Sequence, residues 1–91
     1  GRELSMRLDK FLKVSRLIKR RTLAKEIADQ GRILINGNVA KAATYVAVGD
    51  EMKIQFGQKL LTIQIDDLKE TVKKDEASNL YTIKHEEYIN Q

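Results

Sequence analysis

Lys19, Arg20 and Arg21 stand at the start of a segment, RLIKRRTLAKEIADQG (residues 16–31), whose apolar residues have helical spacing. Cations at this end destabilise an isolated helix, because its first turn carries unpaired backbone N–H groups and about half a positive charge. The same arrangement favours a bound anion, which the N–H groups and the three side chains attract together. These residue types at this spacing therefore predict a phosphate-binding site.

Further cations extend this site along two neighbouring segments. Arg21 and Lys25 are four residues apart and share one helix face, and Arg32 follows soon after that helix. A second stripe on the preceding segment comprises Arg7, Lys10 and Arg16. The full set of candidate contacts, all cationic or polar and all within the first 41 residues, is Arg7, Lys10, Lys13, Ser15, Arg16, Lys19, Arg20, Arg21, Lys25, Gln30, Arg32 and Lys41.

Positive charge is concentrated in the first part of the chain. Residues 1–41 contain 11 Lys and Arg against 4 Asp and Glu, whereas residues 42–91 contain 6 against 9. A basic patch on a small protein is typical of a nucleic-acid-binding surface. A solvated surface without a ligand is the alternative interpretation. Phe11 and Phe56 fall in the apolar patterns of a helix and a strand, so we expect both in the core. We therefore do not expect RNA binding to depend mainly on base stacking with aromatic side chains.

The composition argues against catalysis and against a membrane location. His85 is the only histidine and there is no cysteine, and no glycine-rich phosphate loop is present. We therefore expect no enzyme, no cofactor, no metal site and no small-molecule substrate. Because apolar runs are short and nothing resembles a signal peptide, we expect a cytoplasmic protein with no membrane partner.

Two helices are expected to position the cations. Residues 1–5 lack periodicity, and we expect them to be an expression scar or a disordered extension. A first short helix follows Met6, because Leu8, Phe11 and Leu12 share one face. The second helix spans residues 22–30 and is ended by Gly31. Its apolar side comprises Leu23, Ala24, Ile27 and Ala28.

After the helices the hydrophobic period changes to two. Asn36 and Gly37 predict a tight hairpin turn, and a second hairpin joins residues 51–56 to residues 60–65 through a turn at Gly57. We expect an α+β fold in which two short helices pack on a small, mostly antiparallel sheet. Residues 6–68 form the domain, and residues 69–91 form a charged, partly ordered C-terminal tail with a short helical turn.

These elements and motifs resemble those of the S-four RNA-binding domain family. The resemblance covers Met6 to about Phe56, and it is carried by short motifs in the family's order. These motifs are Arg7-Leu8-Asp9, Ser15-Arg16, Ala24, Gly31, Ile35-Asn36-Gly37, Lys41 and Gly49-Asp50. The resemblance implies that the two helices and the start of the first hairpin present a basic surface to structured RNA.

Within this family the chain is similar to the small ribosome-associated proteins related to the heat-shock S-four protein, and most to their compact Gram-positive form. That resemblance implies a role in ribosome-associated quality control. It implies binding to large-subunit rRNA and to the peptidyl-tRNA of obstructed subunits, where a tailing factor extends the stalled chain. The acidic residues Asp75, Glu76, Glu86 and Glu87 in the tail favour the compact branch over the form with a long basic extension.

Three supporting residues have two interpretations each. Asp9 is either the partner of an adjacent arginine or a first-turn acid that stabilises the helix dipole. Asn36 and Gly37 are interpreted first as turn residues and second as RNA contacts. Two other functions remain open for the chain. One is a general structured-RNA module in ribosome assembly or translation, and the other is a DNA-binding helix-turn-helix protein, which the few base-reading side chains of the second helix disfavour.

Overall fold

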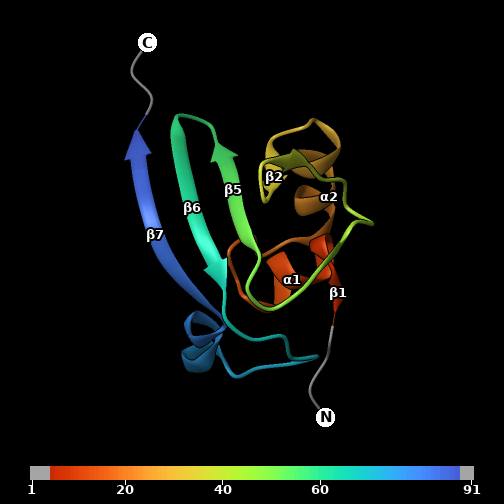
Figure 1. The fold of residues 1–91 in the computed structure, drawn as a ribbon. Helices are drawn as coiled ribbons and strands as arrows, with labels where there is room; N and C mark the ends of the chain where they lie inside the picture. Colours follow the sequence, from red (N-terminus) through yellow and green to blue (C-terminus); the bar gives the residue numbers. More distant parts are fainter. Residues whose placement is uncertain (1–4, 89–91) are drawn as a thin grey trace.

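The fold consists of two helices packed at one edge of an antiparallel sheet, in a computed structural model that describes residues 5–88 (Figure 1). The helices are α1 (Leu8–Val14) and α2 (Arg21–Asp29), with the 3-10 helix η1 (Lys74–Leu80) near the C-terminus. The large sheet has the order β3 (Asn38–Val39), β2 (Ile33–Ile35), β5 (Glu51–Phe56), β6 (Lys59–Ile65) and β7 (Tyr81–Tyr88). A small sheet pairs β1 (Met6–Arg7) with β4 (Tyr45–Val46). This architecture confirms the expected α+β fold.

Each helix buries the narrow apolar stripe that its spacing creates. In α1, Leu8, Phe11 and Leu12 are fully buried, and each contributes about 1.5–3 kcal/mol by leaving water. In α2 the buried stripe is Ala24, Ile27 and Ala28. Leu23 was expected on the same side, but it is 45% exposed. It precedes Ala24 by one residue, which is about 100° around the helix, so it lies at the flank of the stripe.

Local backbone signals end the elements where the sequence predicts. Gly31 follows α2 with φ +78°, as a glycine at a helix C-terminus does. Asn36 and Gly37, with φ values of 51° and 87°, form the two-residue loop between β2 and β3. The side-chain oxygen of Asn36 also accepts a hydrogen bond of 3.0 Å from the backbone N–H of Glu51. These contacts support the turn interpretation of Asn36 and Gly37.

The C-terminal segment was expected to be a partly ordered tail, but it forms the helix η1 and the strand β7. Helix η1 buries Ala77 and Leu80, and β7 then pairs antiparallel with β6 from Ile65↔Tyr81 to Lys59↔Tyr88. Apart from Tyr81, every residue of β7 is exposed, so backbone pairing rather than a buried apolar face holds the strand. Without such a face its sequence carries little periodicity, which explains why the strand was not predicted.

Two further expectations concern the ends of the chain and the membrane. Residues 1–4, which belong to the expected scar or extension, lie outside the described residues. Between residues 5 and 88, none of the helices combines the length and the apolar character needed to cross a bilayer.

Candidate RNA-binding surface

The start of α2 presents free backbone donors beside cationic side chains. Arg20 is the N-cap residue and Arg21 is the first helical residue, and no side chain caps this end of the helix. The first turn also contains no acidic residue. This helix end therefore has the electrostatic character predicted for a phosphate site.

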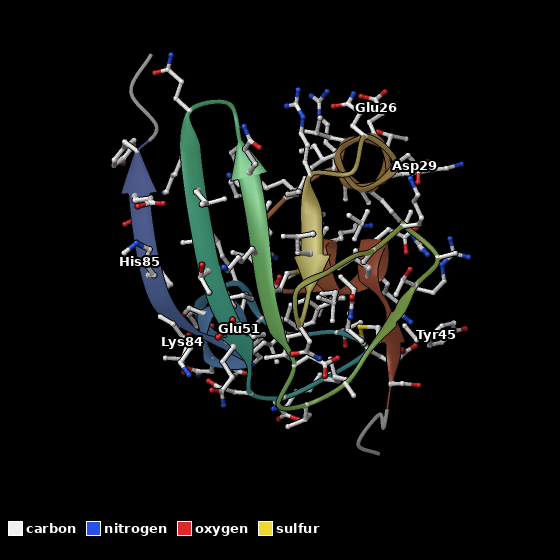
Figure 2. The ribbon with its side chains drawn as sticks, turned by 45° about the horizontal axis from the view of Figure 1, so that its top comes forward. Glu26, Asp29, Tyr45, Glu51, Lys84 and His85 are labelled. Atoms are coloured by element: carbon white, nitrogen blue, oxygen red, sulfur yellow. The ribbon has the colours of Figure 1, made fainter. Side chains whose placement is uncertain are left out.

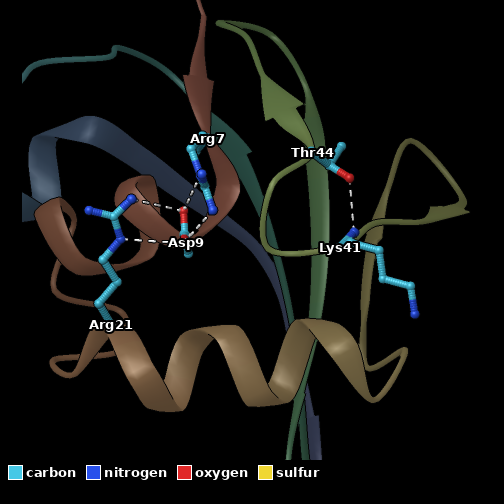
Figure 3. A network of polar contacts seen from close by, with 5 residues as sticks. All are labelled: Arg7, Asp9, Arg21, Lys41 and Thr44. Carbon is cyan, nitrogen blue, oxygen red and sulfur yellow. Dashed lines mark hydrogen bonds and ion pairs between the residues drawn. The ribbon is translucent and has the colours of Figure 1, made fainter.

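Asp9 joins the first stripe of cations to the second. Its carboxylate is held by Arg7, with Nε–Oδ1 and Nη2–Oδ2 distances of 3.2 Å, and by Arg21, with an Nε–Oδ2 distance of 3.3 Å (Figure 3). The Asp9 side chain is only 4% exposed, whereas those of Arg7 and Arg21 are 43% and 48% exposed. The acid is therefore buried beneath two arginines that remain open to solvent. Of the two interpretations of Asp9, the structure supports the arginine partner.

The pKa of Asp9 reflects two opposing effects. Burial raises the pKa of this carboxyl, but hydrogen bonds and charge attraction from Arg21 and Arg7 outweigh burial and hold the pKa below its ordinary value. Asp9 is therefore ionised at neutral pH, and each arginine keeps a fixed anionic partner.

Five of the candidate cations converge on one groove of about 340 Å³, which we call the basic groove. They are Lys10, Lys13, Arg16, Lys19 and Arg21. The opposite wall is the connection between β6 and η1, which contributes Glu70, Thr71 and Val72. Lys10 forms an ion pair with Glu70 across the groove. A hollow of this charge and size can hold phosphate groups of a nucleic acid backbone.

The other candidate residues lie outside the basic groove. Lys25 and Gln30 line a second, more open hollow of about 470 Å³, together with Thr22 and the acids Glu26 and Asp29; Figure 2 shows both acids on α2. Arg20 and Arg32 are exposed and are not part of either hollow.

Two candidates make contacts that maintain the fold. The Ser15 side chain is buried, and its hydroxyl donates a 3.3 Å hydrogen bond to the carbonyl of Leu12. Lys41 donates from Nζ to the Asp29 carbonyl at 3.3 Å, near the C-terminus of α2, and from its backbone N–H to Thr44 at 2.9 Å (Figure 3). Ser15 is therefore withdrawn from any ligand, and Lys41 stabilises a helix end.

Two parts of this surface were not predicted from the sequence. Residues 70–72 were expected in the tail, and only the path of the chain after β6 brings them to the basic groove. Tyr45 lies beside Arg7, Lys10 and Arg21 in an adjoining hollow of about 300 Å³. The only signal in the sequence was a Tyr followed by an apolar Val, which the structure shows as an exposed and a buried residue of β4. A two-residue strand is too short for such an alternation to be recognised.

Arg16 holds a left-handed backbone conformation, with φ 62°, directly after the C-cap of α1. Its N–H donates to the Lys13 carbonyl at 3.0 Å, and the Ile18 N–H donates to the Leu12 carbonyl at 3.1 Å. Glycine usually occupies such a position, and a residue with a Cβ costs about 1–2 kcal/mol there. Arg16 therefore carries a backbone cost while its side chain lines the basic groove.

Replacing Arg16 by Gly is expected to stabilise the free protein and to weaken RNA binding. Relief of backbone strain should raise the free energy of unfolding by up to about 1 kcal/mol, because the extra backbone entropy of glycine offsets part of the gain. Loss of one phosphate contact should lower the affinity for tRNA roughly tenfold at about 0.1 M salt. Urea denaturation and filter binding measure the two effects.

Arg16→Ala is the matched control for this prediction. It keeps the left-handed strain and removes the charge, so it should lose affinity without gaining stability. Equal stability of the two variants would show that the backbone at residue 16 is not strained. If both variants bound tRNA with the affinity of the parent, Arg16 would not be an RNA contact.

Comparisons with known proteins agree with this geometry. The S4 domain matches residues 6–52. The RQC P-site tRNA stabilizing factor of Bacillus subtilis (strain 168) is 67% identical over 86 residues, which cover 94% of this chain and 100% of that protein. The factor of the same name from Halalkalibacterium halodurans is 69% identical and covers 94% of this chain and 98% of its own length.

A solved structure shows the same fold. Heat Shock Protein 15 of Vibrio cholerae superimposes with a TM-score of 0.80 at 31% identity, over 87% of this chain and 81% of that one. The comparisons confirm both parts of the resemblance, to the S-four family and to its small ribosome-associated members. The chain therefore belongs to the S4 domain family, in the same group as the RQC P-site tRNA stabilizing factors of Bacillus subtilis and Halalkalibacterium halodurans.

Proposed function

We propose that this chain is a non-catalytic RNA-binding protein of ribosome-associated quality control, which holds the peptidyl-tRNA on an obstructed large ribosomal subunit. The observation that carries the proposal is the 67% identity, over the full length of the relative, to a factor named for stabilising a P-site tRNA. The basic groove supplies the physical basis, because five cations around one hollow attract a phosphate backbone. The protein acts by binding and positioning, in the cytoplasm where ribosomes work.

Phosphate binding in the basic groove competes with one internal contact. Lys10 already pairs with Glu70 in the free protein, so a phosphate entering the groove shares or replaces that carboxylate. Lys13, Arg16 and Lys19 gain a partner when phosphate binds, and Arg21 gains a second partner beside Asp9. The mutual repulsion of the groove cations then decreases. Part of the electrostatic cost of assembling these cations in the free protein is thus recovered on binding.

Arg7 and Arg21 act as one unit in this proposal. The sequence pattern predicted two separate stripes for them, but Asp9 holds both guanidinium groups at one point of the surface. The surface divides instead into the basic groove and the outer side of α2, where Lys25 lies. We propose that these two parts contact different RNA segments, rRNA of the large subunit and the tRNA, and that a tailing factor then extends the stalled chain.

The test of this function is to capture tagged protein from cells and to sequence the RNA that it retains. We expect 23S-type rRNA and tRNA, with the tRNA still esterified to peptide, and a depletion of small-subunit rRNA. Retention of rRNA from both subunits in equal amounts would favour the general structured-RNA module instead. Enrichment of messenger RNA or of DNA would contradict the proposal.

A further inference from the structure

Tyr45 is the exposed aromatic side chain that lies beside the cations of the binding surface. It is 64% exposed and projects from β4 away from the body of the molecule (Figure 2). It lines the hollow of about 300 Å³ that also contains Arg7, Lys10 and Arg21. An isolated exposed apolar residue needs no explanation, but an aromatic ring within reach of three cations has the composition of a nucleotide site.

The backbone holds Tyr45 in a fixed position relative to the arginines. Tyr45 is directly opposite Arg7 in the antiparallel pair of β1 and β4, so the two side chains lie on one face of the small sheet, with Cβ atoms about 4.5–5.5 Å apart. Val46, the next residue, is buried, and the N–H of Leu8 donates to the Thr44 carbonyl at 2.7 Å. The ring is therefore attached to a strand that the core and α1 anchor.

Arg7 is also fixed at its far end. Asp9 accepts hydrogen bonds from two nitrogens of the Arg7 guanidinium, so the cation cannot swing away from the ring's side of the surface without breaking both. The result is an exposed ring, a positioned cation and an open hollow in one place. A phosphate on the arginines would leave the base of the same or the adjoining nucleotide near the ring.

We propose that Tyr45 is a stacking platform for an unpaired nucleobase of the bound RNA. This inference rests on the proposed RNA-binding function and adds a preference for RNA with an accessible base next to the gripped phosphates. The phenol ring supplies the contact, because every base has a π-face, and the hydroxyl is not required. Base-paired RNA keeps its bases stacked internally, so it would use the cations alone.

Two RNA probes test this inference, a blunt RNA duplex and the same duplex with a short single-stranded adenine extension that contains 2-aminopurine. Tyr45→Ala should lower the affinity for the extended duplex about 5- to 100-fold and leave the affinity for the blunt duplex unchanged. Tyr45→Phe should behave as the parent. In the parent, binding should quench 2-aminopurine fluorescence, and Tyr45→Ala should abolish the quenching.

Tyr88→Ala is the matched control. Tyr88 is 69% exposed and lies at the end of β7, outside the hollows that surround the cations, so its removal should change neither affinity. Thermal unfolding should show that the Tyr45 variants keep the parental fold.

Three outcomes would overturn the inference. Equal weakening of both probes by Tyr45→Ala would mean that the ring acts only by supporting Arg7. Parental binding of both probes by that variant would mean that the ring contacts something other than RNA. If the parent bound neither of the two probes, the proposed RNA-binding function itself would be rejected. This result differs from the other two, in which the parent binds RNA.

Discussion

The double variant Lys13→Glu/Lys19→Glu is expected to lose retention on large subunits that carry a peptidyl-tRNA. Both lysines line the basic groove, and neither forms an ion pair with another described residue. The substitutions therefore remove two cations without breaking a structural ion pair. Each phosphate contact is worth roughly tenfold in affinity at about 0.1 M salt, so the loss should be at least about 100-fold.

Charge reversal at Arg7 or Arg21 would be a less clear test. Either change places a second carboxylate against Asp9, which is almost fully buried, and so combines a folding defect with a binding defect. Lys13 and Lys19 avoid this difficulty. They are the better positions for separating the two effects.

Lys53→Glu/Lys84→Glu is the control for the groove variant. It changes the net charge by the same amount, but at exposed residues of β5 and β7 that line none of the hollows around the cations. Figure 2 shows Lys84 on β7, at the opposite edge of the molecule from α2. Sedimentation with subunits that carry or lack peptidyl-tRNA should show parental retention for this control. Equal losses in both variants would mean that net charge, and not the basic groove, determines retention.

Salt dependence on isolated tRNA provides a second readout of the same pair of lysines. The logarithm of the parental binding constant should fall linearly with the logarithm of salt concentration. The slope of the groove variant should be shallower by about 1.4–1.8, which corresponds to two lost phosphate contacts. A slope identical to that of the parent would contradict phosphate contact by Lys13 and Lys19.

The helices and hairpins of this fold could be predicted because each depends on neighbouring residues. Gly31 ends α2 by accepting a positive φ, and Asn36 with Gly37 turns the chain between β2 and β3 for the same reason. The buried stripe of α1 follows from spacing along a single helix. Such local signals can be recognised without knowing how the rest of the chain folds.

The parts of the site that escaped prediction depend on residues distant in the sequence. Asp9 could be placed next to Arg7 from the sequence, but its contact with Arg21 requires the packing of α1 on α2. Glu70 reaches Lys10 only because the chain returns past α1 after β6. Tyr45 faces the cations because β4 pairs with β1. Charge patterns predict candidate residues, and tertiary contacts decide which of them lie together.

Asp9→Asn is expected to have the largest effect on stability among the substitutions considered. It removes the charge that two arginines share at a side chain only 4% exposed. If Arg7 and Arg21 were fully buried, the loss in free energy of unfolding would be several kcal/mol. Because both guanidinium groups can be hydrated once the ion pairs are lost, we expect the free energy of unfolding to fall by roughly 1–3 kcal/mol at pH 7. Urea denaturation measures this loss. Asp29→Asn, at an exposed carboxyl at the end of α2, should stay within about 0.5 kcal/mol of the parent.

The loss should depend on pH with a defined sign. The pKa of Asp9 is below its ordinary value in the folded protein, so the unfolded chain binds the proton more readily. The stabilisation is fully present above the ordinary pKa of about 4 and is lost as the pH falls through the folded value. The difference between parent and Asp9→Asn should therefore be largest near neutral pH and shrink in acid. A difference that is the same at pH 7 and pH 3 would show that the charge of Asp9 contributes nothing.

The effect of Asp9→Asn on RNA affinity separates two roles of an acid within a basic surface. If net charge alone governed binding, removal of a carboxylate would strengthen the attraction for phosphate. If Asp9 acts by holding Arg7 and Arg21 in place, its removal lets both guanidinium groups move, and the entropy lost on binding increases. We expect the second effect to dominate, because both arginines donate to this one buried carboxylate. Affinity for tRNA should then fall although the protein becomes more positive, and a rise in affinity would show that Asp9 is only a structural acid.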